Sequence, residues 1–150
     1  MIAINHALTG GIVAISVSKP ILALPAALAS HFFLDMLPHW DYKVPSAIKY
    51  RPLIIGMDIL VSTIAILFLG LFLDVEYWLF ALGALLGVLP DIMWLPYIFF
   101  GRPTPYDKKN ILHTLRRFHF RIQWSESASG LFVELGWLFM LVVLLVNLGK

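Results

Sequence analysis

Long apolar segments separated by short polar ones are the feature that most restricts how this chain can fold. Five such segments have the length and composition of helices, at about residues 3–18, 20–37, 52–73, 77–97 and 127–147. The chain is 60% hydrophobic and 13% charged, whereas soluble domains are about 45–50% apolar and about 25% charged. We therefore predict an all-α integral membrane bundle of about five helices, forming a single domain over residues 1–150. The first two helices are short, so they either cross the membrane or form a re-entrant hairpin.

Basic residues gather on one side of this predicted topology. Nine of the eleven fall in the polar segments 38–51 and 101–126, namely Lys43, Lys49, Arg51, Arg102, Lys108, Lys109, Arg116, Arg117 and Arg121. The positive-inside rule places these two loops, and with them the N-terminus, on the cytoplasmic side of the cytoplasmic membrane. Thr104, Pro105 and Asp107 are typical of a helix start, so we expect a short helix through Arg117 on the cytoplasmic surface.

The end of the second apolar segment combines histidines and acids. If this stretch is helical up to Pro38, His31 and Asp35 lie one turn apart on the same helix face. Pro38 then turns the chain and returns His39 and Asp41 toward the same end. Imidazoles and carboxylates in this arrangement are ligands for zinc and similar divalent ions. A hydrogen-bonded pair at a helix end is the simpler alternative for His31 and Asp35.

Every histidine, and every acid inside a predicted helix, falls in the cytoplasmic half of the bundle. The helical ones are His6, His31, Asp35, Asp58, Asp91 and Glu134, and the loops add His39, Asp41, His113 and His119. A charge inside a span costs roughly 2.5–3.5 kcal/mol, so each needs a partner or a function. One divalent cation would stabilise several carboxylates together. The chain has no cysteine, which excludes disulfides, thiolate zinc sites and cysteine nucleophiles.

Several of these residues also have simpler explanations. Asp58 can pair with a basic residue, or it can orient a histidine that binds metal. Asp91 can cap a broken helix, and Glu134 can reach the membrane interface. The arginines of the second loop are most often inside-positive residues that bind anionic headgroups. The sharper hypothesis for them is phosphate recognition over a metal site.

The pattern resembles the small membrane-bound metal-dependent hydrolases of bacteria and archaea, a family remotely similar to zinc-dependent phospholipase C. The resemblance rests on an early His6, on Ser-His-x-x-x-Asp-x-x-Pro-His-x-Asp at 30–41 and on Leu-Pro-Asp at 89–91. It implies that the metal ligands are His31 and Asp35, with His6, His39 and Asp91 as further candidates. The family's His-Arg-Gly-x-Thr-His motif has its nearest equivalent between His113 and His119, which adds these two histidines to the candidate ligands.

The leading functional hypothesis is a metal-dependent hydrolase whose cytoplasmic site acts on a phosphoester, such as a lipid headgroup. Zinc is the expected metal, with manganese as the alternative, and Asp41 or Asp58 would serve as general base. Substrate would be oriented by Arg116, Arg117 or Arg121. Two other classes stay open: a transporter or ion-handling protein, and a non-catalytic membrane subunit with a structural metal. The lipid bilayer is the expected partner, and nothing in the sequence indicates nucleic acid.

Overall fold

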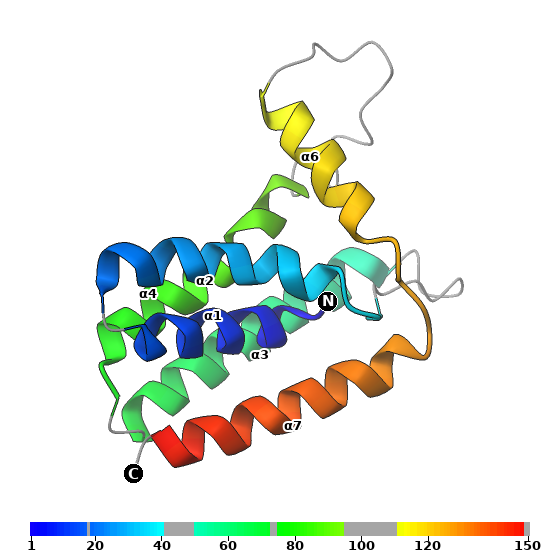
Figure 1. Cartoon of the computed structure of the whole chain (residues 1–150). Helices are drawn as coiled ribbons and strands as arrows, with labels where there is room; N and C mark the ends of the chain where they lie inside the picture. Colours follow the sequence, from blue (N-terminus) through cyan, green and yellow to red (C-terminus); the bar gives the residue numbers. More distant parts are fainter. Residues whose placement is uncertain (18, 41–49, 73–74, 95–110, 149–150) are drawn as a thin grey trace.

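The computed structural model describes residues 1–17, 19–40, 50–72, 75–94 and 111–148. In chain order the elements are α1 (Ala3–Ser16), α2 (Pro20–Asp35), α3 (Arg51–Phe72), α4 (Tyr77–Val88), the 3-10 helix η2 (Leu89–Trp94), α6 (Ile111–Ile122) and α7 (Gly130–Leu148), as Figure 1 shows. The prediction of an all-α fold is confirmed for this part of the chain. Asp41, the expected helix start at Thr104 and most of the two basic loops lie outside the described residues.

The central element of the bundle is α1, which lies among α2, α3, α4 and α7 (Figure 1). Ten of its 14 residues are buried, and its most extensive contact is with α4. Glycines make this contact close: a Cβ atom on Gly10 would collide with the carbonyl oxygen of Gly83, and one on Gly87 with the carbonyl of His6. Small residues allow helix backbones to approach in the same way inside membranes. This packing fixes the end of α4 next to the start of α1.

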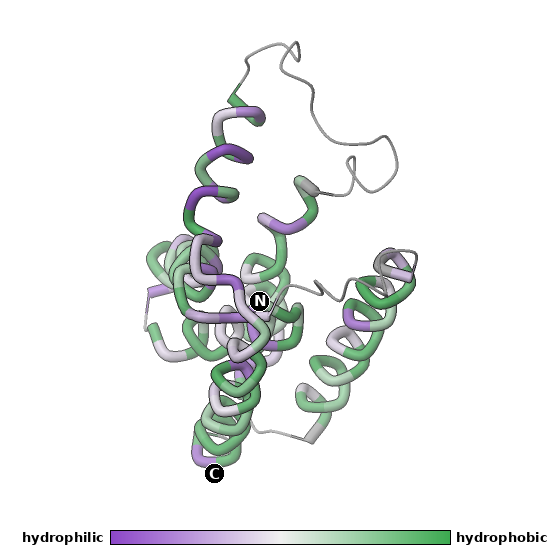
Figure 2. The backbone as a smooth tube through the Cα atoms, turned by 90° about the vertical axis from the view of Figure 1, so that its right-hand side faces the viewer, coloured by the Kyte–Doolittle hydropathy of each residue, from purple (hydrophilic) through white to green (hydrophobic). Residues whose placement is uncertain are grey.

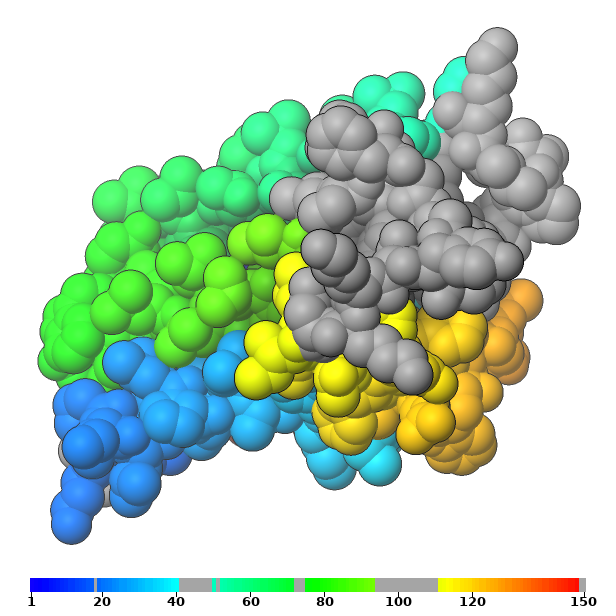
Figure 3. Space-filling model, turned by 90° about the horizontal axis from the view of Figure 1, so that it is seen from above, coloured from blue at the N-terminus to red at the C-terminus, as the bar shows by residue number. Residues whose placement is uncertain are grey.

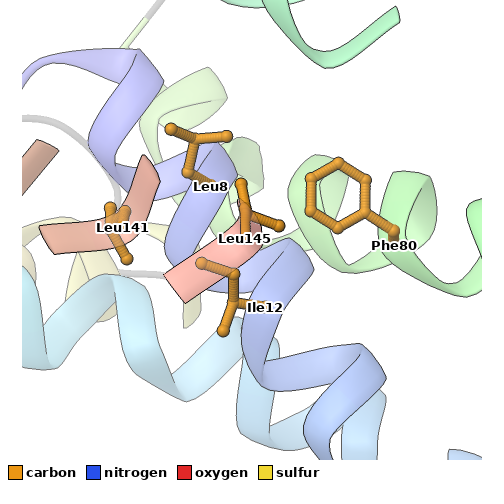
Figure 4. Packing of buried hydrophobic residues seen from close by; sticks show 5 residues of the cluster. All are labelled: Leu8, Ile12, Phe80, Leu141 and Leu145. Carbon is orange, nitrogen blue, oxygen red and sulfur yellow. The ribbon is translucent and has the colours of Figure 1, made fainter. Parts of the chain in front are cut away.

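The apolar core joins α1, α4 and α7. Leu8, Ile12, Phe80, Leu141 and Leu145 form one buried cluster, in which the side chains of three helices meet (Figure 4). The many van der Waals contacts of these side chains hold the three helices together.

Two helices, α3 and α7, are long and apolar enough to cross a membrane, over Pro52–Leu71 and Gly130–Leu148. Only 6% and 17% of these windows is buried inside the protein, whereas the core helix of a soluble protein is mostly buried. Large apolar side chains cover their outer surfaces, for example Leu71 and Phe132, which are 82% and 77% exposed. Such surfaces suit a lipid environment.

The remaining helix, α6, projects sideways from the bundle near the end of α2 (Figure 1). It differs from the other helices in composition, because hydrophilic residues recur along it while the bundle helices are predominantly apolar (Figure 2). In the space-filling view it lies on the surface beside α2 (Figure 3). Only its last turns are buried, at His119 and Ile122.

Candidate metal centre

Four side chains from three elements form a compact group at one end of the bundle. They are His31 and Asp35 of α2, Asp91 of η2 and His119 of α6, and each offers one ligand atom within 4.8 Å of the others. His31, Asp35 and His119 are fully buried, while the side chain of Asp91 is 34% exposed. Imidazole nitrogens and carboxylate oxygens in this number are a donor set for zinc, manganese or iron.

The α2 pair follows from helix geometry. His31 and Asp35 are one turn apart, and the His31 Nε2 atom lies 3.2 Å from Asp35 Oδ2. The helix ends directly after Asp35, where the Met36 amide bonds back to the preceding turn, and Pro38 prevents it from continuing. The pair is therefore held at the last turn of a buried helix.

Asp91 enters the group because α4 tightens into a 3-10 turn. The α-helix ends at Val88 and η2 begins at Leu89. Pro90 lacks the amide hydrogen that the α-helical ladder needs at this point. The turn brings Asp91 Oδ1 to 3.7 Å from His31 Nε2 and 3.9 Å from His119 Nε2.

His119 comes from the helix outside the bundle. Its Nε2 atom lies 2.6 Å from Asp35 Oδ2 and 3.0 Å from His31 Nε2. Gln123, one turn later in the sequence, donates from Nε2 to the same oxygen of Asp35 at 3.3 Å. The sequence analysis did not identify Gln123, although its spacing of four from a candidate histidine is a usable signal.

The ring of His31 has a defined tautomer. Its Nδ1 atom lies 2.7 Å from the carbonyl oxygen of Gly87, and since a carbonyl only accepts, Nδ1 carries the hydrogen. In the neutral ring Nε2 then presents a lone pair toward Asp35 and His119. His119 Nε2 can carry only one hydrogen, so it cannot donate a full hydrogen bond to both His31 and Asp35. Histidines that bind metals are oriented in this way, with the other ring nitrogen donating to a carbonyl.

The second oxygen of Asp35 faces α1. His6 Nε2 lies 3.1 Å from Asp35 Oδ1, and the amino nitrogen of Met1 lies 3.2 Å from it. The buried His6 ring stacks on His31, with ring centroids 4.1 Å apart. His6 is thus a neighbour of the four-residue group, and Asp35 joins it to His31 and His119.

The other candidate histidines lie apart from this group among the described residues. The buried ring of His39 is turned to its own segment, where Nδ1 lies 2.8 Å from the carbonyl oxygen of Leu37. The backbone carbonyl of His39 accepts from the Ser127 amide at 2.9 Å, which ties this turn to the start of α7. His113 lies on α6, six residues before His119, and lines a surface pocket.

The two acids in α3 and α7 hold the start of α1. Asp58 Oδ2 accepts the Ala3 amide at 2.7 Å. Glu134 accepts the Ile2 amide through Oε2 at 3.0 Å and the Trp40 amide through Oε1 at 2.8 Å. The first amides of a helix have no partner in the helix, and negative groups stabilise that end. These contacts account for the buried Glu134 and the half-buried Asp58 without any metal.

The three arginines of α6 lie on two different sides of the helix. Arg116 Nε donates to the carbonyl oxygen of Met93 at 3.0 Å, so it lies against η2, the element that carries Asp91. Arg117 and Arg121 are each two residues from His119, about 200° around the helix. They line a separate pocket of about 420 Å³ together with Thr114 and Phe118. Only Arg116 is therefore close to the candidate metal centre.

Comparison with protein-family models, with curated proteins and with solved structures gives no match for this chain.

Proposed function

We propose that His31, Asp35, Asp91 and His119 bind one divalent metal ion, with zinc as the first choice, in a membrane-embedded hydrolase. The observation that carries the proposal is the orientation of His31, whose Nδ1 is committed to Gly87. Its Nε2 atom is therefore directed at Asp35 and His119, and in the neutral ring it presents a lone pair to them. The resemblance to membrane-bound metal-dependent hydrolases agrees with this site.

The membrane placement rests on α3 and α7, the two helices with the length and composition of spans. With 14 and 16 residues, α1 and α2 are about 21 and 24 Å long, shorter than a hydrocarbon core of about 30 Å. They suit a hairpin in which α1 is the buried helix and α2 packs on it. We place the end that holds the metal-ligand group on the cytoplasmic side, following the basic loops.

The reaction that we propose is hydrolysis of a phosphoester, for example in a lipid headgroup. A bound divalent ion would lower the pKa of a water molecule and polarise a phosphoryl oxygen. Asp91 is the partly exposed member of the group, so substrate would approach beside η2. A phosphate there would meet the guanidinium of Arg116, which η2 already holds in place. We propose Asp41 or Asp58 as general base, Asp58 sharing its carboxylate with the Ala3 amide.

Metal content of the purified protein tests the site. The wild type should contain about one zinc or manganese ion, and His119→Ala should lose it. His113→Ala is a matched control, since it removes the same side chain from the same helix outside the group. Wild-type protein without metal, or equal metal in the two variants, would reject the site.

Catalysis needs a separate test. A panel of phosphoesters should be hydrolysed by the metal-loaded wild type, with activity lost on chelation and regained on adding metal back. Arg116→Gln should raise KM more than it lowers kcat, because the guanidinium is expected to bind the phosphate. Activity that does not change on chelation would reject the mechanism.

A structural metal is the second candidate function. Three of the four ligands are fully buried, and a metal there would join α2, η2 and α6. Under this alternative chelation lowers the unfolding temperature and no phosphoester is hydrolysed. Both candidate functions therefore require the bound metal, and only the hydrolase predicts phosphoester hydrolysis.

A further inference from the structure

Two faces of α6 carry different kinds of residue. The face that contains His119 also contains Ile111, Leu115, Phe118 and Ile122, as the 3.6-residue period requires. Only the end of this face is buried, at His119 and Ile122. Toward its start the apolar side chains are uncovered, with Ile111 82% and Leu115 48% exposed. The first half of α6 therefore presents an apolar surface beyond the bundle.

A second face of α6, which adjoins the apolar one at Phe118, is cationic and hollowed. His113, Arg117 and Arg121 follow one another at intervals of four residues, so they form a single row. With Thr114 and Phe118 they line the pocket of about 420 Å³. Within the described residues no carboxylate pairs with the guanidinium of Arg117 or Arg121. The pocket thus offers two arginines and an apolar wall.

The direction of α6 places this pocket near the phosphates of membrane lipids. The helix projects sideways from the bundle (Figure 1), so when α3 and α7 cross a bilayer it extends along the membrane surface. An amphipathic helix in that position buries its apolar face at the headgroup boundary, and its arginines reach the phosphates. Arginine forms paired hydrogen bonds with phosphate oxygens.

We propose that this face of α6 binds the headgroup phosphate of an anionic phospholipid, while Ile111 and Leu115 enter the acyl layer. This lipid site is distinct from the metal centre, because Arg117 and Arg121 point away from His119. It rests on the membrane placement proposed above and on no assumption about the metal. The lipid holds α6, and with it His119, against the end of α2.

Binding of short-chain lipids to the full-length protein in detergent tests the proposal. Dihexanoyl-phosphatidylglycerol should bind at least about tenfold more tightly than dihexanoyl-phosphatidylcholine. Arg117→Gln and Arg121→Gln should each weaken the binding about fivefold, and the double variant about 25-fold. Lys19→Gln is the matched control, because Lys19 is an exposed basic residue at the other end of α2, and it should leave binding unchanged.

Conservative variants separate loss of the site from loss of the fold. Arg117→Lys with Arg121→Lys keeps both charges but loses the paired hydrogen bonds, so its affinity for phosphatidylglycerol should lie between those of the wild type and the double glutamine variant. Equal binding of the two lipids, or undiminished binding in the double glutamine variant, would overturn the proposal. Inorganic phosphate that binds as tightly as phosphatidylglycerol would also overturn it, because the pocket would then recognise the free anion. Metal content is not a readout here, so failure of the metal site and failure of the lipid site are distinguishable.

Discussion

Asp35 is the residue on which the candidate centre depends most. One carboxylate oxygen faces His31, His119 and Gln123, and the other faces His6. A buried carboxylate with so many nitrogen neighbours is favourable only while its charge is compensated. Through these contacts, Asp35 links α2 to His6 of α1 and to His119 of α6.

The first prediction compares the two carboxylates of the metal-ligand group. Asp35→Asn should lower zinc affinity by more than about 100-fold, since even partners that only orient a ligand contribute about 10–100-fold. Asp91→Asn should cost less, because its oxygen lies farther from the imidazoles, at 3.7 and 3.9 Å. Isothermal titration of the chelated protein with zinc measures both. An equal or larger loss for Asp91→Asn would contradict this order.

Helix geometry made part of this site predictable. The pair His31 and Asp35 follows from a spacing of four in a helical segment, and its contact is present. Proximity in sequence also favoured His39, but Pro38 lies between them and does not specify the direction of the next turn. The imidazole that joins the pair is His119, because α6 packs on the end of α2. No local pattern encodes that long-range contact.

At the scale of elements, the start of α1 is held by side chains from two other helices. Their positions along the predicted helices placed Asp58 and Glu134 at the same end of the bundle as the histidines. The metal interpretation did not foresee that their partners are backbone amides of α1 and of Trp40. Backbone donors are invisible in a pattern of side chains. The sequence therefore suggested a basic partner, a metal-binding histidine or a general-base role for Asp58 and the membrane interface for Glu134, and it did not suggest these amides.

The second prediction concerns Glu134. Glu134→Ala leaves the partly buried amides of Ile2 and Trp40 without their acceptor, and an unsatisfied buried group costs about 1–3 kcal/mol. We expect about 3 kcal/mol lower stability, and about half of that for Glu134→Gln, which keeps one oxygen. Unfolding in mixed micelles with increasing dodecyl sulfate measures the difference. Leu135→Ala, at a position 52% exposed, is the control, and a variant of Glu134 as stable as this control would refute the role.

The third prediction concerns the close contact of α1 with α4. A Cβ atom on Gly10 would collide with the backbone of Gly83, so Gly10→Ala should destabilise the bundle by about 1–3 kcal/mol. The matched control is Gly56→Ala in α3, where a Cβ meets nothing within 4 Å. There alanine should stabilise the helix by about 0.5–1 kcal/mol. Opposite signs in the same unfolding assay support the contact, and equal effects contradict it.

At the scale of the whole molecule, polar and apolar surfaces are divided between the ends and the sides. Composition alone predicted a membrane protein, and the structure has two exposed apolar helices that fit this. Composition could not predict which helices lie inside the bundle and which face outward. The short α1 lies in the centre, α2 packs against α1 and α4, and the long α3 and α7 carry much of the outer apolar surface. A helix too short to span the membrane, such as α1, can be accommodated where other helices surround it.

The fourth prediction tests this arrangement in a membrane. Since the chain has no cysteine, single cysteines can be placed at Ala128, before α7, and at Lys19, before α2. Both positions are exposed. A membrane-impermeant maleimide should label Ala128→Cys in inverted vesicles and not in intact cells, because basic loops stay cytoplasmic. Lys19→Cys should be labelled from the outside if α1 and α2 cross fully, and from neither side if they form a re-entrant hairpin. Labelling of both cysteines from the same side would contradict the topology, and with it the placement of the metal centre at the cytoplasmic end.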